Sequence, residues 1–138
     1  MNRKPVIAFL CIQNSCRSQL AEAFGRHLAA ETFTSCSAGT HPAGQINPAA
    51  QRLMKEHYQI DMEGEGQYAK GMDRLPPLDA AVTMGCGVHC PVLPGVRMIS
   101  WEIPDPAGKP DDDFLTIMET IRKKVLDLQN QLKGDFSL

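Results

Sequence analysis

The segment 11–18 carries the residues best suited to chemistry, a cysteine and an arginine separated by five residues and followed by a serine. It lies between the apolar run 6–10 and a helical pattern that begins at Gln19. A loop between a strand and a helix gathers backbone N–H groups at the positive end of the helix dipole, where a tetrahedral anion can bind. Arg17 adds a planar group that can bond two oxyanion oxygens. The same field favours the thiolate form of Cys11, which predicts a nucleophile facing a bound oxyanion.

A strand-helix-strand unit must hold this loop in place. The run 6–10 contains only Val, Ile, Ala, Phe and Leu, which is typical of a central parallel strand covered on both faces. From Gln19 the apolar residues recur at helical spacing, which predicts a helix to about Ala30 with Ser18 as its cap. Residues 32–38 predict a second strand before a loop rich in glycine and proline.

The rest of the chain continues this alternation. Asn47 and Pro48 are a capping residue and a first helical residue, and they predict a helix over 47–58. The later elements are expected to be a loop over 60–75 with a short helix near 68–72, strands over 78–84 and 96–101, an exposed loop over 102–113, and a helix from Phe114 to about Leu132. The fold class is therefore α/β, a doubly wound, four-stranded parallel sheet flanked by helices.

The loops that follow the later strands carry further candidates. Cys86 and Cys90 lie in a glycine-containing segment after the third expected strand, and Asp105 lies in the loop after the fourth. In open parallel sheets, ligands bind outside the carboxyl ends of the strands. We therefore expect the loops of Cys11, Cys86 and Asp105 to share one mouth.

Length and composition restrict the function classes. With 138 residues, of which 43% are hydrophobic, the chain is expected to form a single catalytic domain over 1–138 without a structural disulfide or metal. A net charge of −2 without a basic stripe predicts no nucleic-acid or membrane surface. No apolar run approaches the roughly 20 residues of a membrane span, and no signal-like segment begins the chain, so a cytoplasmic location is expected. Five cysteines then favour catalytic or redox thiols in a reduced compartment.

Six short motifs occur along the chain in a characteristic order, and their combination is far more specific than any one of them. They are Cys11-Ile-Gln-Asn-Ser-Cys-Arg-Ser, Ser37-Ala-Gly, Asn47-Pro-Ala, Val82-Thr-Met-Gly-Cys-Gly, Cys90-Pro and Asp105-Pro-Ala-Gly-Lys. With these motifs the chain resembles, from residue 6 to about residue 132, the arsenate reductases of the low-molecular-weight protein tyrosine phosphatase superfamily. The resemblance implies the fold of those phosphatases.

The resemblance also implies a substrate and roles for the site residues. Arsenate is a tetrahedral oxyanion like phosphate, and Cys11 would attack its arsenic atom. Asp105 would be the general acid that protonates the departing oxygen, and Ser18 would hydrogen-bond the Cys11 thiolate. The residues expected to bind the anion are Ile12, Gln13, Asn14, Ser15, Cys16, Arg17 and Ser18.

The two later cysteines are implied to form a thiol relay. Cys86 would attack the Cys11 sulfur and release arsenite, and Cys90 would then attack Cys86, which leaves a disulfide that a thioredoxin-like partner reduces in a transient complex. No tightly bound cofactor is expected, only this external thiol. The C-x3-C spacing and the intervening Gly85 depart from the best-known thioredoxin-coupled pattern. A glutaredoxin or a low-molecular-weight thiol could therefore resolve the bond between Cys11 and Cys86, with Cys90 as a bystander.

Two other functions remain open at this point. A phosphatase acting on phosphotyrosine or a small phosphoester could use the same Cys11, Arg17 and Asp105. It would not require the two later cysteines, and phosphatases of this type usually place an aromatic residue where this chain has Ala107. A non-enzymatic thiol sensor that binds arsenite or zinc would need neither Arg17 nor Asp105.

No metal is predicted. The C-x3-C segment with His89 lacks a second pair of zinc ligands. Asn14, Glu22 and Ser37 match positions of a polar network around the anion loop, which in some family members holds potassium. The segment after Ile60 offers no clear counterpart to the remaining member of that network.

Overall fold

The structure, a computed structural model, describes residues 4–85 and 92–134. Its centre is a sheet of four parallel strands in the order β2-β1-β3-β4. The strands are β1 (Val6–Cys11), β2 (Thr34–Gly39), β3 (Ala80–Thr83) and β4 (Arg97–Ser100). The expected α/β class with a four-stranded parallel sheet flanked by helices is confirmed, and β1 lies between two other strands as its apolar sequence predicts.

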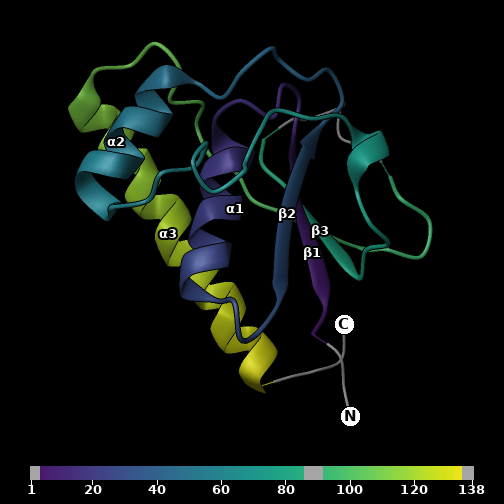
Figure 1. Cartoon of the computed structure of the whole chain (residues 1–138). Helices are drawn as coiled ribbons and strands as arrows, with labels where there is room; N and C mark the ends of the chain where they lie inside the picture. The colour runs from purple at the N-terminus through teal and green to yellow at the C-terminus, as the bar shows by residue number, and fades with distance from the viewer. Residues whose placement is uncertain (1–3, 86–91, 135–138) are drawn as a thin grey trace.

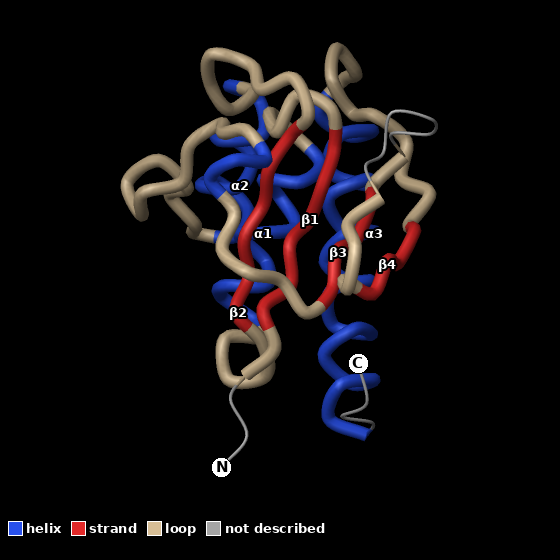
Figure 2. Tube along the Cα trace, turned by 90° about the vertical axis from the view of Figure 1, so that its right-hand side faces the viewer, coloured by secondary structure: helices blue, strands red, loops and turns tan. Residues whose placement is uncertain are grey.

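Three α-helices lie together on one face of this sheet (Figures 1 and 2). They are α1 (Arg17–Leu28), α2 (Pro48–Tyr58) and α3 (Asp111–Gly134). Phe9 of β1, Phe24 of α1 and Phe114 of α3 belong to the same buried cluster. Phe24 also packs edge-on against Tyr58 of α2, with 5.0 Å between the ring centroids. The larger part of the core therefore lies between the helices and the sheet.

The opposite face of the sheet differs from the expectation for a doubly wound sheet. Small and medium side chains cover it, among them Ala8, Leu10 and Ala81. The part of the connection from β2 to β3 that follows α2 packs against them as an irregular segment that contains the 3-10 helix η1 (Met72–Arg74). In the described parts of the chain, no α-helix lies on this face, because α2 packs beside α1 and α3 instead.

The element boundaries agree with the sequence in most places, with two corrections. The expected cap of α2 is confirmed, because Asn47 Oδ1 accepts hydrogen bonds from the N–H groups of Ala49 and Ala50 at 2.9 and 3.1 Å. The cap expected at Ser18 is wrong, since α1 begins at Arg17, two residues before the expected start at Gln19, and Ser18 is buried inside it. The short helix expected near 68–72 lies over 72–74 instead. Among the described residues, no helix has the length and apolarity to cross a membrane.

Candidate active site

The loop between β1 and α1 turns its carbonyl groups outward. They accept hydrogen bonds of 2.7 to 3.3 Å from backbone N–H groups of the segment 40–47, in the pairs Thr40 with Cys11, His41 with Ile12, Ala43 with Gln13, and Asn47 with Ser15. In a trans peptide unit the N–H points opposite to the C=O, so the N–H groups that follow these carbonyls point into the concavity of the loop. The N–H of Asn14 does so, and donates to Cys11 Sγ at 3.2 Å. The loop thus presents converging backbone donors, an arrangement that suits a tetrahedral anion.

Two backbone features allow the loop to close this tightly. Asn14 has a φ of 51°, in the left-handed region that asparagine tolerates better than most residues. Gly39, at the end of β2, lies directly behind the loop, and a Cβ atom there would be 2.5 Å from the Ile12 carbonyl oxygen. Gln13, also in this loop, does not have a positive φ, and its side chain is exposed.

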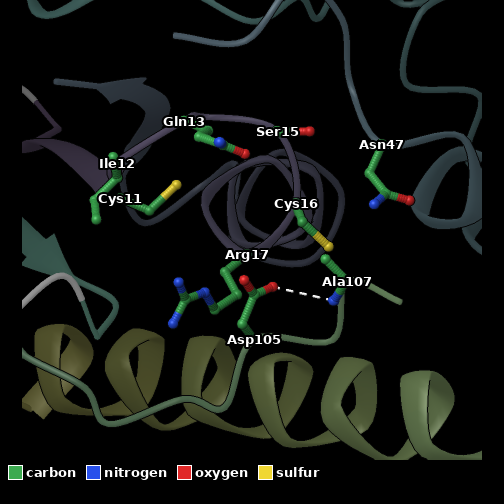
Figure 3. A pocket seen from close by; sticks show the side chains of 9 residues that line it. All are labelled: Cys11, Ile12, Gln13, Ser15, Cys16, Arg17, Asn47, Asp105 and Ala107. Atoms are coloured by element: carbon green, nitrogen blue, oxygen red, sulfur yellow. Dashed lines mark hydrogen bonds between the residues drawn. The ribbon is translucent and has the colours of Figure 1, made fainter. Parts of the chain in front are cut away.

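Cys11 and Arg17 face the same concavity (Figure 3). The Cys11 side chain is buried, and its Sγ lies 2.7 Å from Ser18 Oγ. Arg17, at the first turn of α1, donates from Nη1 to the carbonyl oxygen of Ile103 at 2.8 Å. Gly85 also packs against this guanidinium group. The arginine therefore reaches the pocket from one element and is held there by two others.

The pocket itself has a volume of about 230 Å³. Asp105 reaches it from the loop after β4, and its Oδ1 accepts a hydrogen bond from the N–H of Ala107 at 3.0 Å. The lining residues are Cys11, Ile12, Gln13, Ser15, Cys16, Arg17, Asn47, Asp105 and Ala107. The structure thus brings the Cys11 loop and the Asp105 loop to one mouth. Cys86 and Cys90, expected at the same mouth, lie outside the described residues.

Cys16 differs from Cys11 although both line the pocket. Its side chain is buried, and this burial, with smaller contributions from the charges of Asp105 and Cys11, raises the pKa of its thiol. A thiol with a raised pKa stays protonated and unreactive near neutral pH. Cys36, on β2, likewise has its pKa raised to about 12 by burial. Both therefore have the properties of packing thiols.

A buried polar network lies behind Cys11 and contains a lysine. Ser37 donates to Glu22 Oε1 at 2.6 Å and accepts from Asn14 Nδ2 at 3.0 Å. The Lys70 ammonium lies 3.3 Å from both Glu22 Oε1 and Ser37 Oγ. The Lys70 side chain therefore supplies a positive charge beside the buried Glu22 carboxylate. Within the described part of the chain, no group of three His, Cys, Asp or Glu side chains is placed to hold a metal ion.

Comparison with known proteins agrees with this geometry. The family model for low molecular weight phosphotyrosine protein phosphatase matches residues 6–138. The chain belongs to this family. Within the low molecular weight phosphotyrosine protein phosphatase family, Arsenate reductase 1 of Staphylococcus haemolyticus strain JCSC1435 is 35% identical over 132 residues, or 94% of this chain and 98% of that protein. The resemblance to arsenate reductases of this superfamily is thereby confirmed.

Solved structures of arsenate reductases share the fold of this family member. One of them, described as an arsenate reductase in the phosphate binding state, is 28% identical in sequence to this chain and superimposes on it with a TM-score of 0.79. The match covers 92% of this chain and 98% of the other. A thioredoxin-dependent arsenate reductase of Corynebacterium glutamicum is 28% identical, has a TM-score of 0.75 and covers 96% of this chain. This chain spans 63% of the length of the Corynebacterium protein.

Several buried polar residues behind the Cys11 loop were not predicted from the sequence. Lys70 lies 48 positions from Glu22 in the chain, and Gln67 lies 48 positions from Gln19. Gln19 is fully buried and Gln67 nearly so, although glutamines in a helix or a loop are usually exposed. No local pattern marks such residues, because only the fold brings them together.

Proposed function

We propose that this chain reduces arsenate to arsenite through a cysteine relay that begins at Cys11. The observation that carries the proposal is the single pocket in which Cys11, the backbone donors of its loop, Arg17 and Asp105 meet. The identity to proteins named arsenate reductases supports the choice of substrate, and the phosphate binding state of a solved relative supports an anion of this shape. We also propose that residues 1–138 act as one catalytic domain.

In the first step the thiolate of Cys11 attacks arsenic, a sulfur–arsenic bond forms, and one oxygen leaves. Asp105 donates the proton that lets this oxygen leave as water. Arg17 and the backbone N–H groups of the loop bind the remaining oxygens and stabilise the charge that develops on them. The Ser18 hydroxyl group, 2.7 Å from the sulfur, stabilises the attacking thiolate.

In the second step Cys86 attacks the sulfur of Cys11. A disulfide forms between them, the sulfur–arsenic bond breaks, and its electron pair stays on arsenic, which leaves as arsenite. The two cysteines thus supply the two electrons. Cys90 then attacks Cys86 and frees Cys11, and a thioredoxin-like dithiol reduces the last disulfide. Cys86 and Cys90 are assigned from the sequence pattern, and the thioredoxin dependence of the Corynebacterium relative supports the choice of reductant. Because the relay needs reduced thiols, we propose a cytoplasmic location.

A phosphatase is the second candidate, because Cys11, Arg17 and Asp105 would also hydrolyse a phosphoester. Ala107 lines the mouth of the pocket, where the phosphatases of this superfamily usually present an aromatic side chain to an aryl substrate. The geometry therefore favours a small inorganic anion over phosphotyrosine.

Arsenate turnover in cysteine variants tests the proposal. Wild type, Cys11→Ser, Cys86→Ser and Cys90→Ser would be assayed with a thioredoxin system and, separately, with glutaredoxin and glutathione. Cys36→Ser is the matched control, since Cys36 lies on β2 away from the pocket lining, and it should keep wild-type turnover. The relay requires loss of turnover in Cys11→Ser and Cys86→Ser.

The remaining outcomes separate the alternatives. Loss of turnover in Cys90→Ser with thioredoxin supports the three-cysteine relay, whereas retention with glutaredoxin supports direct resolution of the bond between Cys11 and Cys86. Full turnover in Cys86→Ser contradicts any relay through that residue. Hydrolysis of p-nitrophenyl phosphate at an ordinary enzymatic rate, without arsenate turnover, would show that the chain is a phosphatase.

A further inference from the structure

A chain of buried hydrogen bonds reaches Cys11 from the far side of the anion loop. Gln67 Nε2 donates to Gln19 Oε1 at 2.9 Å, and Gln19 Nε2 donates to Asn14 Oδ1 at 2.8 Å. Asn14 Nδ2 donates to Ser18 Oγ at 2.8 Å, and Ser18 Oγ lies 2.7 Å from Cys11 Sγ. All three carboxamide side chains are at most 4% exposed. Each one donates in the direction of the cysteine.

Backbone groups fix the direction of this chain. Gln19 Nε2 lies 2.8 Å from the carbonyl oxygen of Tyr68 and 3.1 Å from that of Asn14. A carbonyl can only accept, so this end of the Gln19 carboxamide must be the nitrogen, whose two protons are shared among these two oxygens and Asn14 Oδ1. The backbone N–H of Lys70 points to Asn14 Oδ1 at 3.0 Å. Since an N–H can only donate, the oxygen of the Asn14 carboxamide must point to the Lys70 N–H. If the Asn14 carboxamide were reversed, its nitrogen would face this N–H group, and if the Gln19 carboxamide were reversed, its oxygen would face two carbonyl oxygens.

The consequence appears at the Ser18 hydroxyl group. The Nδ2 group of Asn14 can only donate, so Ser18 Oγ accepts there, and its single proton remains available for Cys11. A hydroxyl group that donates to sulfur stabilises the thiolate, whereas one that accepts from sulfur stabilises the neutral thiol. The direction of the amide chain therefore decides which form of Cys11 the serine favours.

We propose that Gln19 is a positioning residue for Cys11, because its Nε2 group, together with the backbone N–H of Lys70, holds the Asn14 carboxamide in the orientation that makes Ser18 donate to the sulfur. The inference rests on the proposed role of Cys11 as the attacking thiolate. It extends the network beyond Asn14 and Ser18 to the first turns of α1 and to the backbone of residues 68 and 70.

One charged group near Cys11 is linked to Gln19 through a shared acceptor, because the Lys70 ammonium group and Gln19 Nε2 both donate to the Tyr68 carbonyl oxygen, at 3.2 and 2.8 Å. Arg17 and Asp105 line the pocket with Cys11, and the pair of Lys70 and Glu22 lies behind Ser37. None of these side chains has a hydrogen bond to the Gln19 carboxamide among the described residues. A change in Cys11 reactivity on substitution of Gln19 would therefore report either the amide chain or the Lys70 charge, and the Ser18→Ala background described below separates the two.

Gln19→Met tests the proposal, because methionine has a similar length but neither donates nor accepts a strong hydrogen bond. The readout is the rate of Cys11 alkylation by iodoacetamide against pH, followed by peptide mass spectrometry on the full chain without arsenate. Without Gln19, the midpoint of the rate profile should move upward by about one pH unit, which makes alkylation below the midpoint roughly tenfold slower. Gln129→Met on α3 is the matched control. Gln129 donates to the Leu28 carbonyl oxygen at 3.1 Å, and its loss should leave the profile unchanged.

Ser18→Ala shows whether Gln19 acts through the serine. In a Ser18→Ala background, Gln19→Met should cause no further shift. If Gln19→Met does not fold, as judged by thermal unfolding, Gln67→Met should give a smaller shift in the same direction, since it removes one of the contacts that orient the Gln19 carboxamide.

Three outcomes of the alkylation experiment bear on the role of Gln19. An unchanged profile in folded Gln19→Met, or in Gln67→Met when only that variant folds, overturns the proposal. A shift that persists undiminished in the Ser18→Ala background also overturns it. The predicted shift in a protein that turns over no arsenate would support the positioning role and contradict the proposed function alone.

Discussion

Arg17 is held at the pocket by two residues that lie far from it in the sequence. Its Nη1 atom donates to the carbonyl oxygen of Ile103, and Gly85 packs against the same nitrogen. A Cβ atom at Gly85 would lie only 2.7 Å from Nη1, and the φ of Gly85 is 88°. Glycine is thus required there both by the backbone conformation and by the close approach of the arginine.

Gly85→Ala should therefore weaken anion binding as well as stability. The left-handed φ adds strain of about 1 to 3 kcal/mol, and the new methyl group displaces the guanidinium group from its hydrogen bond. The loss of one well-placed, charge-assisted hydrogen bond to the anion should weaken phosphate binding about tenfold. Isothermal titration calorimetry with phosphate measures the affinity, and urea unfolding measures the stability.

Gly66→Ala is the matched control for this prediction. Gly66 has a similar φ of 93°, but no atom outside its immediate neighbours lies within 4 Å of the position a Cβ would take. The variant should show the strain without the loss of affinity. An equal loss of phosphate affinity in both variants would show that the contact with Arg17 is not the cause.

At the level of single residues, site residues that lie within one sequence motif could be predicted, whereas site residues that only the fold brings together could not. Cys11 and Arg17 were predicted from their spacing in one loop, and the structure places them at one pocket with Asp105. In the sequence, nothing distinguishes Gln19 from an ordinary polar residue at the start of a helix. Its partner Gln67 lies on a separate loop, so nothing local indicates that the two are buried together.

The secondary-structure elements were predicted best where one apolar pattern runs without interruption. The strand at 6–10 and the long helix after Asp111 agree with the structure to within a few residues. Ser18 was wrongly predicted as a helix cap because serine often has this role, whereas here its hydroxyl group is engaged with Cys11 and Asn14. The irregular cover of the second sheet face was not predicted either, because its contacts join segments distant in sequence.

Helix α2 is connected to the site through its capping residue. The Asn47 side chain caps the helix through Oδ1, and its backbone N–H donates to the Ser15 carbonyl oxygen at 2.8 Å. The same side chain lines the pocket, with its Nδ2 atom turned away from the cap (Figure 3). One residue thus couples the start of a helix to the anion loop.

Substitutions of Asn47 should separate these two roles. Asn47→Ala removes the cap and should lower the free energy of unfolding by about 0.5 to 2 kcal/mol. Asn47→Asp keeps a capping oxygen and should keep most of this stability, but its negative charge at the pocket should weaken phosphate binding. Urea unfolding and titration calorimetry measure the two effects.

The Asn47 variants need a control at an asparagine that lies away from the pocket. Asn130→Ala changes an exposed asparagine on α3, and should alter neither stability by more than about 0.5 kcal/mol nor phosphate affinity. Phosphate affinity in Asn47→Asp equal to that of the wild type would show that the Asn47 side chain lies too far from the anion to affect it.

For the whole molecule, anion binding depends on local geometry and not on net charge. The chain carries 14 basic and 16 acidic residues, so its overall charge does not attract an anion. The pocket combines residues of the loop after β1, the start of α2 and the loop after β4. The unfolded chain does not hold these groups together, so an anion that binds the pocket binds the folded state alone.

Phosphate should therefore stabilise the fold in proportion to its occupancy of the pocket. At a free concentration one hundred times its Kd, it should raise the free energy of unfolding by about 2.7 kcal/mol, and Tm by several degrees for a chain of this size. Differential scanning calorimetry over a phosphate series measures the effect. Sodium chloride at matched ionic strength is the control for screening, and Arg17→Lys, which loses the planar two-point contact, should show a smaller rise at equal phosphate. An equal rise in chloride would show that the stabilisation comes from general screening of charge and not from an anion in this pocket.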